Sequence, residues 1–139
     1  MKSVLRHALA ALGLTLALLA PQAKADDGAA MRAVIEEQLQ AFSRDDWADA
    51  FRHASPGIQS MFRTPDRFGA MVMQGYPMVW RPSRVEAGPV EQGPRGPVQL
   101  MYFEDQSGSL YIAAYEMVLV DGVWRIDGVR IRKAPAAAV

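Results

Sequence analysis

The segment LYIAAYEMVLVDGVWRIDGVRIRK, Leu110 to Lys133, decides the fold of this 139-residue chain. Leu110 to Val120 is rich in β-branched and aromatic residues and predicts a strand. Asp121-Gly122 follows it, and this dipeptide is typical of a two-residue type I′ turn between antiparallel strands. The segment therefore predicts a β-hairpin, around which the other elements can be placed.

The second strand of this hairpin is predicted to contain a bulge. Trp124 and Ile126 share one parity along the strand, whereas Val129 and Ile131 have the opposite parity. One extra residue at Asp127-Gly128 would return all four side chains to the same face of the sheet. Such a bulge would also curve the sheet and help it to wrap around helices.

Two further extended segments precede the hairpin. Val98 to Glu104 predicts a strand that is joined to the hairpin across DQSGS. Gly88 to Pro97 contains three Gly-Pro pairs, and we expect a loop or an irregular hairpin end there. Trp80 to Val90 is interrupted by Pro82 and Pro89; because proline cannot donate to a ladder, we expect this segment to be an edge strand.

The chain before Tyr76 has helical spacing instead. Apolar residues recur every three or four positions early in the chain, at Met31, Val34, Ile35, Leu39 and Phe42. Three polar capping signals then predict three more helix starts, at Asp45-Asp46, Ser55-Pro56 and Thr64-Pro65. No strand is expected between them, since SPGIQSMFRTPDRF also looks helical. The predicted fold class is α+β, with N-terminal helices packed on a curved antiparallel sheet of about four strands.

The first 25 residues have the pattern of a secretory signal peptide. Lys2 and Arg6 precede the apolar run ALAALGLTLALLA, and Ala23-Lys24-Ala25 is a small-x-small site for cleavage after Ala25. The apolar run is shorter than the roughly 20 residues of a spanning helix, so we expect no membrane attachment after cleavage. Residues 26–139 are predicted to form a single α+β domain with its core at about residues 28–133, located in the periplasm or secreted.

Composition excludes several kinds of chemistry. Removing Lys2, Arg6 and Lys24 from the balance of 15 basic and 15 acidic residues leaves a net charge of about −3, which gives no electrostatic basis for binding nucleic acid. After cleavage the chain keeps one histidine, one lysine and no cysteine, so neither a metal site nor a bound cofactor is expected. Met71 and Met73 could offer thioethers to Cu(I), but methionine is also the usual filler of apolar gaps.

Four segments of the chain carry a resemblance to a known family. They are DDWADAFRHASP, FGAMVMQGYPMVWRP, YEMV and WRIDGV, and together they span essentially all of the predicted domain. The chain resembles the exported bacterial proteins of domain-of-unknown-function family 4864, within the nuclear-transport-factor-2-like, or cystatin-like, superfamily. The resemblance implies a cone-shaped fold in which helices close over a curved sheet. It implies no activity, because no acid–base signature of the superfamily enzymes aligns with this chain.

Glu116 is the first candidate for acid–base chemistry, because it interrupts an otherwise apolar face that includes Ile112 and Val118. Buried without a partner, its carboxyl would have a raised pKa and could serve as a general base. The alternative is an ion pair with an arginine of a neighbouring strand, such as Arg125. In an unbulged hairpin Glu116 would face Asp127, which makes Asp127 a second candidate.

His53 is the third candidate, because an imidazole can transfer protons near neutral pH. Asp49 lies one helical turn before it and could orient the ring. The alternative is a histidine at a helix end that interacts with the terminal carbonyls just before Ser55-Pro56.

The segment GYPMVWRP, Gly75 to Pro82, suggests either a ligand-binding mouth or the elbow between helices and sheet. Gly75, Pro77 and Pro82 are explained by an elbow alone. An elbow does not explain two large aromatic side chains beside an arginine. We therefore take Tyr76, Trp80 and Arg81 as candidate pocket residues, together with Tyr115 on the predicted sheet.

Two classes of function follow from these observations. The first is a non-enzymatic module that binds a small apolar ligand or a protein partner, with a homodimer through the sheet as one arrangement. The second is a small cofactor-independent enzyme of the lyase or isomerase type that uses a carboxylate or His53 in the cone. The first is favoured, because no acid–base pair is fixed by spacing in the sequence.

Overall fold

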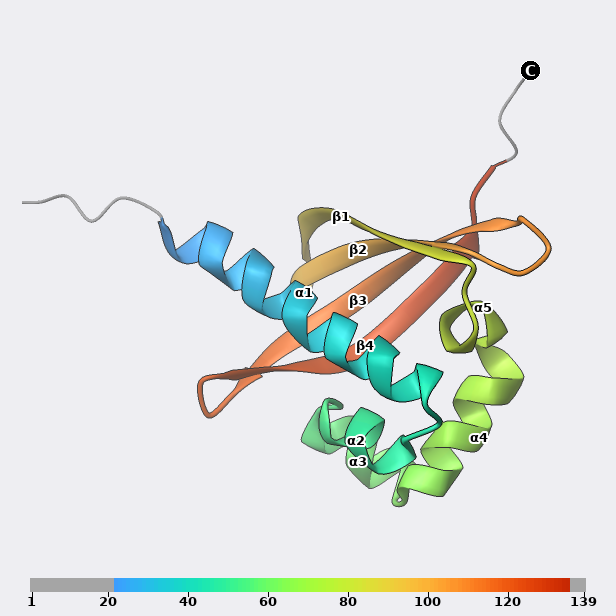
Figure 1. The fold of residues 1–139 in the computed structure, drawn as a ribbon. Coiled ribbons are helices and arrows are strands. Elements are labelled where there is room, and N and C mark those ends of the chain that lie inside the picture. The colour runs from blue at the N-terminus through green and yellow to red at the C-terminus, as the bar shows by residue number, and fades with distance from the viewer. Residues whose placement is uncertain (1–21, 136–139) are drawn as a thin grey trace, which may run out of the picture.

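The computed structural model describes residues 22–135, in which helices come first and strands follow (Figure 1). The helices are α1 (Gln22–Ser43), α2 (Trp47–Arg52), α3 (Pro56–Phe62), α4 (Pro65–Gly75) and α5 (Pro77–Trp80). The strands are β1 (Arg84–Gly93), β2 (Gly96–Glu104), β3 (Leu110–Val120) and β4 (Val123–Lys133). The predicted α+β class, with helices followed by a four-stranded antiparallel sheet, is confirmed.

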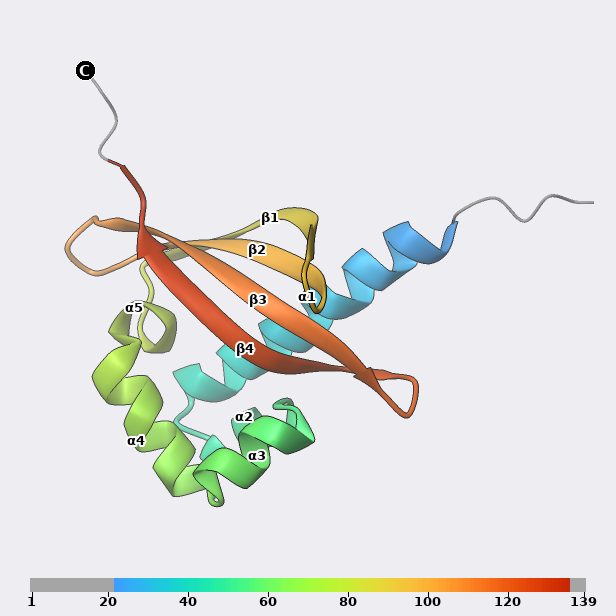
Figure 2. The ribbon, with the colours of Figure 1, turned by 180° about the vertical axis from the view of Figure 1, so that it is seen from behind.

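The strands form one open sheet in the order β1-β2-β3-β4, and each strand is antiparallel to its neighbour. All the described helices lie over the same face of this sheet, and the view from behind shows the strands with no helix over their other face (Figure 2). The segment between α2 and α4 contains α3 and no strand, as predicted, within the described residues. Ala54, just before α3, forms an isolated parallel bridge with Ile126 of β4.

The β3–β4 hairpin agrees in detail with its sequence. Asp121 and Gly122 have φ values of 50° and 76°, the pair of positive angles that a type I′ turn requires. Glu116 pairs with Gly128 whereas Met117 pairs with Ile126, so Asp127 is the extra residue of a bulge. The predicted turn and the predicted bulge are both confirmed.

Helices α2, α3 and α4 begin where the capping signals in the sequence predicted. The side chain that precedes each of α2, α3 and α4 accepts a hydrogen bond from the backbone N–H three residues later: Asp46 from Asp49, Ser55 from Ile58 and Thr64 from Arg67. Proline occupies the first turn of α3 and of α4, where its missing N–H leaves no hydrogen bond unmade.

The segment after Tyr76 differs from its prediction. Trp80 was expected to begin a strand, but it is the last residue of α5, and β1 begins only at Arg84. Pro77 explains the difference, because its fixed φ suits the first position of a helical turn. The β1 strand is nevertheless an edge strand of the sheet, as predicted.

The Gly-Pro-rich segment from Gly88 to Pro97 is more regular than predicted. Only Pro94 and Arg95 lie outside β1 and β2, so it is the end of a hairpin and not a loop. Pro89 lies where the β1–β2 register shifts, between Ala87 and Val90. The ladder is already interrupted there, which is why a proline is tolerated.

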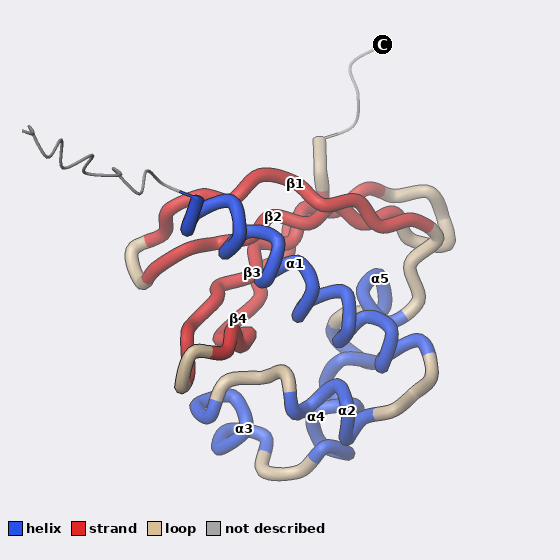
Figure 3. The backbone as a smooth tube through the Cα atoms, turned by 60° about the vertical axis from the view of Figure 1, so that its left-hand side comes forward, coloured by secondary structure: helices blue, strands red, loops and turns tan. Residues whose placement is uncertain are grey.

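The core lies between α1, α2, α4 and α5 on one side and the inner face of the sheet on the other (Figure 3). Its most deeply buried members come from both layers: Met31, Ile35, Ala41, Ala50, Met101, Phe103, Ala113 and Tyr115. The predicted signal peptide falls mainly on residues outside the described range, while its cleavage residue Ala25 lies near the start of α1. None of the described helices is long and apolar enough to cross a membrane.

Candidate functional site

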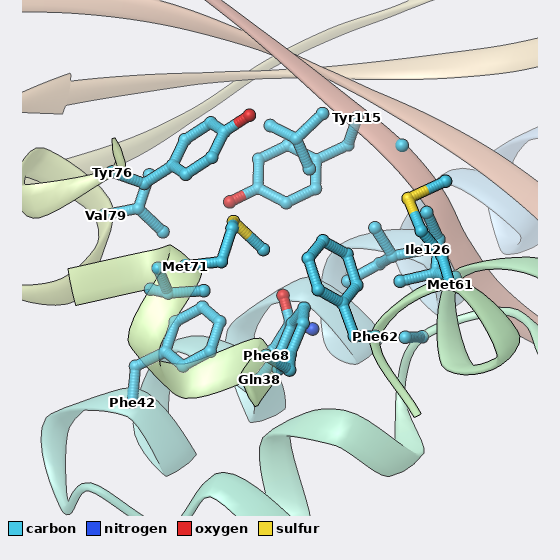
Figure 4. Close-up of a pocket in the computed structure, with 15 residues that line it drawn as sticks. Gln38, Phe42, Met61, Phe62, Phe68, Met71, Tyr76, Val79, Tyr115 and Ile126 are labelled. Carbon is cyan, nitrogen blue, oxygen red and sulfur yellow. The ribbon is translucent and has the colours of Figure 1, made fainter. Parts of the chain in front are cut away.

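A pocket of about 300 Å³ opens between the helical layer and the inner face of the sheet (Figure 4). The helices, with Tyr76 between α4 and α5, supply most of its wall: Gln38, Phe42, Ile58, Met61, Phe62, Phe68, Met71, Val72, Tyr76 and Val79. The sheet and the segment after α2 supply the rest: Ala54, Tyr115, Ile126, Gly128 and Val129. Most of these side chains are apolar, so the site suits a molecule that is itself largely apolar.

Aromatic packing holds the helical wall of the pocket in place. The Phe68 ring of α4 lies 6.0 Å from Phe42, 5.4 Å from Phe51 and 5.8 Å from Phe62, measured between ring centroids. These distances are typical of favourable aromatic pairs. Phe68 thus joins α1, α2 and α3 to α4 behind the pocket.

Tyr115 is the most deeply buried polar residue of the pocket. Its side chain extends from β3 into the middle of the site, with Phe62, Met71 and Tyr76 around it (Figure 4). Only 1% of the residue is exposed, and its hydroxyl has no hydrogen-bond partner among the described residues. Burial raises the pKa of this hydroxyl far above its usual value, so it stays protonated.

Gln38 of α1 is the second buried polar residue of the pocket wall. Its side-chain nitrogen donates a hydrogen bond to the Ala50 carbonyl at 3.1 Å, which fixes the orientation of the amide. The nitrogen keeps a second hydrogen, and the amide oxygen is the group that Gln38 can offer as an acceptor.

Of the four predicted pocket residues, Tyr76 and Tyr115 line the pocket and Trp80 and Arg81 do not. The Trp80 indole nitrogen donates to Asp45 at 2.8 Å, and Arg81 donates to Asp45 at 3.0 Å and to the Phe42 carbonyl at 3.0 Å. The Arg81 guanidinium also stacks on the Trp80 ring, 4.4 Å from its centroid. This pair therefore ties α5 to the end of α1.

Glu116 lies on the opposite face of the sheet from the pocket. Its carboxylate accepts a hydrogen bond from Arg95, in the β1–β2 turn, and pairs with Arg130 of β4 at 3.1 Å. Its side chain is 11% exposed. The carboxylate is thus paired with arginines of neighbouring elements, and Arg125 instead donates to the Arg52 carbonyl.

Asp127 and His53 also lie outside the pocket lining. Asp127 accepts a hydrogen bond from the Ser55 hydroxyl at 2.7 Å, which joins the β4 bulge to the start of α3. His53 is buried at the end of α2, with its Nε2 3.6 Å from a Glu37 carboxylate oxygen. The three acid–base candidates are therefore not brought together in one site.

Sequence reasoning did not single out Gln38, Ile58 or Phe62 as site residues. The signal was weak, because Ile58 and Phe62 belong to a seven-residue helix in which no residue is fully buried. Met71 was noted for its thioether, and the structure places it in the pocket wall. No three histidine, cysteine, aspartate or glutamate side chains are grouped as in a metal site within residues 22–135.

The outer face of the sheet has a second hollow, of about 330 Å³. Leu100, Ile112 and Ala114 form its floor, and Glu91, Arg130 and Arg132 are among its remaining lining residues. The same face carries Glu116, so charged side chains adjoin the apolar floor.

Comparison with known proteins identifies the family. The profile of the family described as Domain of unknown function (DUF4864) matches residues 24–139, and the chain belongs to this family. No curated protein and no solved structure shows a significant match.

Proposed function

We propose that this member of the DUF4864 family is an exported, non-enzymatic module that binds a small, largely apolar molecule in the pocket between its helices and its sheet. The observation that carries the proposal is the pocket itself, a space of about 300 Å³ lined mainly by aromatic, aliphatic and methionine side chains. An apolar cavity of about half this volume is enough to bind benzene. Burial of the ligand's apolar surface supplies the binding free energy.

The lining of the pocket favours binding over acid–base catalysis. No carboxylate and no imidazole is among the residues that line it within the described chain. Glu116, Asp127 and His53 lie elsewhere, each with a charged or hydroxyl-bearing neighbour. An enzyme of the lyase or isomerase type would need a group that moves a proton within reach of its substrate.

The location and the wider fold are part of the same proposal. The charged start, apolar run and small-x-small site within residues 1–25 support export to the periplasm or the medium. The curved antiparallel sheet with helices over one face supports a nuclear-transport-factor-2-like cone. In such a cone the pocket would be the space that the helices enclose.

A dye-binding assay with a pocket-filling variant tests the binding function. The probe is N-phenyl-1-naphthylamine, a neutral dye whose emission rises in apolar surroundings. Val129 of β4 lines the pocket, so Val129→Phe should reduce the affinity for the dye at least about tenfold. The matched control is Val123→Phe on the same strand, where the side chain is 49% exposed and lies outside the pocket lining.

Ile58→Trp fills the same pocket from α3 and provides a second variant if Val129→Phe unfolds. Equal dye affinity in the wild type, both pocket variants and the control would contradict the proposed function. Native mass spectrometry of the protein purified from its own cells then shows whether a small molecule stays bound, and reports the oligomeric state in the same spectrum.

A further inference from the structure

The Tyr115 hydroxyl is a hydrogen-bonding group that the described part of the chain leaves unused. It is fully buried in the wall of the pocket, and none of the described residues accepts or donates a hydrogen bond there. Burying a hydroxyl without a partner destabilises the folded state, so such groups are rare in folded proteins. A ligand that supplies the missing partner recovers part of this cost when it binds.

The electrostatic character of the pocket lining restricts the charge of the ligand. Its polar lining residues are Gln38, Tyr76 and Tyr115, and no charged side chain is among the described residues that line it. A carboxylate or ammonium group entering the site would lose its hydration without gaining an opposite charge. The pocket therefore favours an uncharged ligand.

The direction of the hydrogen bond follows from the chemistry of the two buried polar groups. A tyrosine hydroxyl has one hydrogen to donate, and here that hydrogen has no acceptor among residues 22–135. The Gln38 nitrogen donates one of its two hydrogens to the Ala50 carbonyl, and the Gln38 amide oxygen is an acceptor. Tyr115 is thus the buried donor of the pocket lining that has no hydrogen-bond partner among the described residues.

We infer that the pocket takes an uncharged molecule with an apolar body and one carbonyl oxygen, and that the Tyr115 hydroxyl donates its hydrogen to that oxygen. The inference rests on the proposed binding function and adds the chemical class and the orientation of the ligand. The carbonyl end lies against β3, and the apolar body lies against the aromatic and methionine side chains of α3 and α4.

Three probes of one shape test the inference: naphthalene, 2-acetylnaphthalene and 2-naphthoate. Affinities are measured by titration followed by NMR at neutral pH. The wild type is expected to bind the ketone about three- to tenfold more tightly than naphthalene, the gain of one net hydrogen bond. The carboxylate is expected to bind at least about tenfold more weakly than the ketone.

Tyr115→Phe removes the hydroxyl and keeps the ring. It should abolish the preference for the ketone and change the affinity for naphthalene by less than about twofold. The matched control is Tyr102→Phe on β2, where the tyrosine is 37% exposed and lies outside the pocket lining. The control should keep the preference for the ketone. Thermal melting of each variant checks that it is folded.

The outcomes separate this inference from the proposed function. Naphthalene binding with no preference for the ketone, or a preference that survives in Tyr115→Phe, would overturn the role of Tyr115 and leave the binding function standing. Tightest binding of 2-naphthoate would overturn the uncharged class. If none of the probes and no neutral dye binds, the proposed function fails and the inference fails with it.

Discussion

Tyr115 and Glu116 are adjacent in β3 and have opposite surroundings, because successive side chains of a strand point to opposite faces. The Tyr115 hydroxyl lies in an apolar pocket without a hydrogen-bond partner among the described residues. The Glu116 carboxylate is paired with Arg95 and Arg130 on the outer face. The group with unused bonding capacity is therefore the neutral one, and this is why we place ligand recognition at Tyr115.

His53 gives the protein a defined dependence of stability on pH. Its burial lowers its pKa below the usual value of 6.5, and the charges of Arg52 and Arg125 lower the pKa too, while Glu37 and Asp49 raise it. The unfolded chain therefore binds a proton at a higher pH than the folded protein does. The free energy of unfolding is expected to be highest above about pH 7 and to fall as the pH decreases through 6.5 towards the folded pKa.

Urea denaturation at several pH values between about pH 8 and pH 5 measures this dependence. His53→Gln should remove most of the slope in this window, since His53 is the one histidine of residues 26–139. The carboxyls of Asp45, Asp49 and Asp105 have pKa values lowered from 3.8 and so titrate below the window. A slope that is unchanged in His53→Gln would assign the effect to another group.

The elements that could be predicted from the sequence are those whose signals are local. Caps at Ser55 and Thr64, the Asp121-Gly122 turn and the bulge at Asp127 each depend on residues close together in the chain. The start of β1 was predicted too early: Pro77 favours a helical turn there, and the Trp80 indole is also held by Asp45, a contact between residues 35 positions apart that local spacing does not reveal.

The candidate site, too, could be predicted from the sequence only where its signals are local. Tyr76 and Tyr115 could be selected from the sequence because large aromatic residues stand out at an elbow and in a strand. The remaining pocket wall depends on how α3 folds back against α4, which brings Phe62 beside Phe68. Neither local spacing nor composition reports a contact of that kind.

The turn between α3 and α4 is strained at Arg63. This residue has φ 70° and ψ −41°, and the Thr64 N–H donates to the Phe62 carbonyl at 2.9 Å, two residues earlier. These features describe a γ-turn with positive φ, a rare conformation for a residue with a side chain. The turn allows α3 and α4 to face the same pocket.

Arg63→Gly should therefore stabilise the protein. Strain of about 1–3 kcal/mol is relieved, and the greater freedom of glycine in the unfolded chain offsets about 0.5–1 kcal/mol of it, so a net gain of about 1 kcal/mol is expected. Arg67→Gly, in the first turns of α4, should instead lower the free energy of unfolding by about 0.5–1 kcal/mol. Urea denaturation compares the two variants, and a loss of stability in both would show that Arg63 is not strained.

At the scale of the whole molecule, the helices cover one face of the sheet and the described chain leaves the other face without a helix (Figure 2). The ligand proposed here would be held between the layers, where α3 and α4 meet β3 and β4. The outer face, with its apolar floor at Leu100, Ile112 and Ala114, is separate from that site. Any association through the outer face would therefore leave the pocket accessible.

Export should remove residues 1–25 without disturbing this architecture. The expected cut after Ala25 lies near the start of α1, and the helix from Asp26 to Ser43 would remain. Its packing is maintained further along, where Met31 and Ile35 are buried in the core. Asp26 and Asp27 would then stand at the new helix start, where negative charge interacts favourably with the helix dipole.

Expression of the complete sequence in a bacterial host, followed by intact-mass measurement of the periplasmic fraction, tests this expectation. The product should have the mass of residues 26–139 and the same melting temperature as that domain expressed directly. Ala25→Leu replaces the small residue at the cleavage site with one of similar helix propensity, so it should block processing and keep the protein in the membrane fraction. A soluble periplasmic product that retains Met1 would contradict the signal peptide, whereas the pocket and its proposed ligand class would remain to be judged by the binding assays alone.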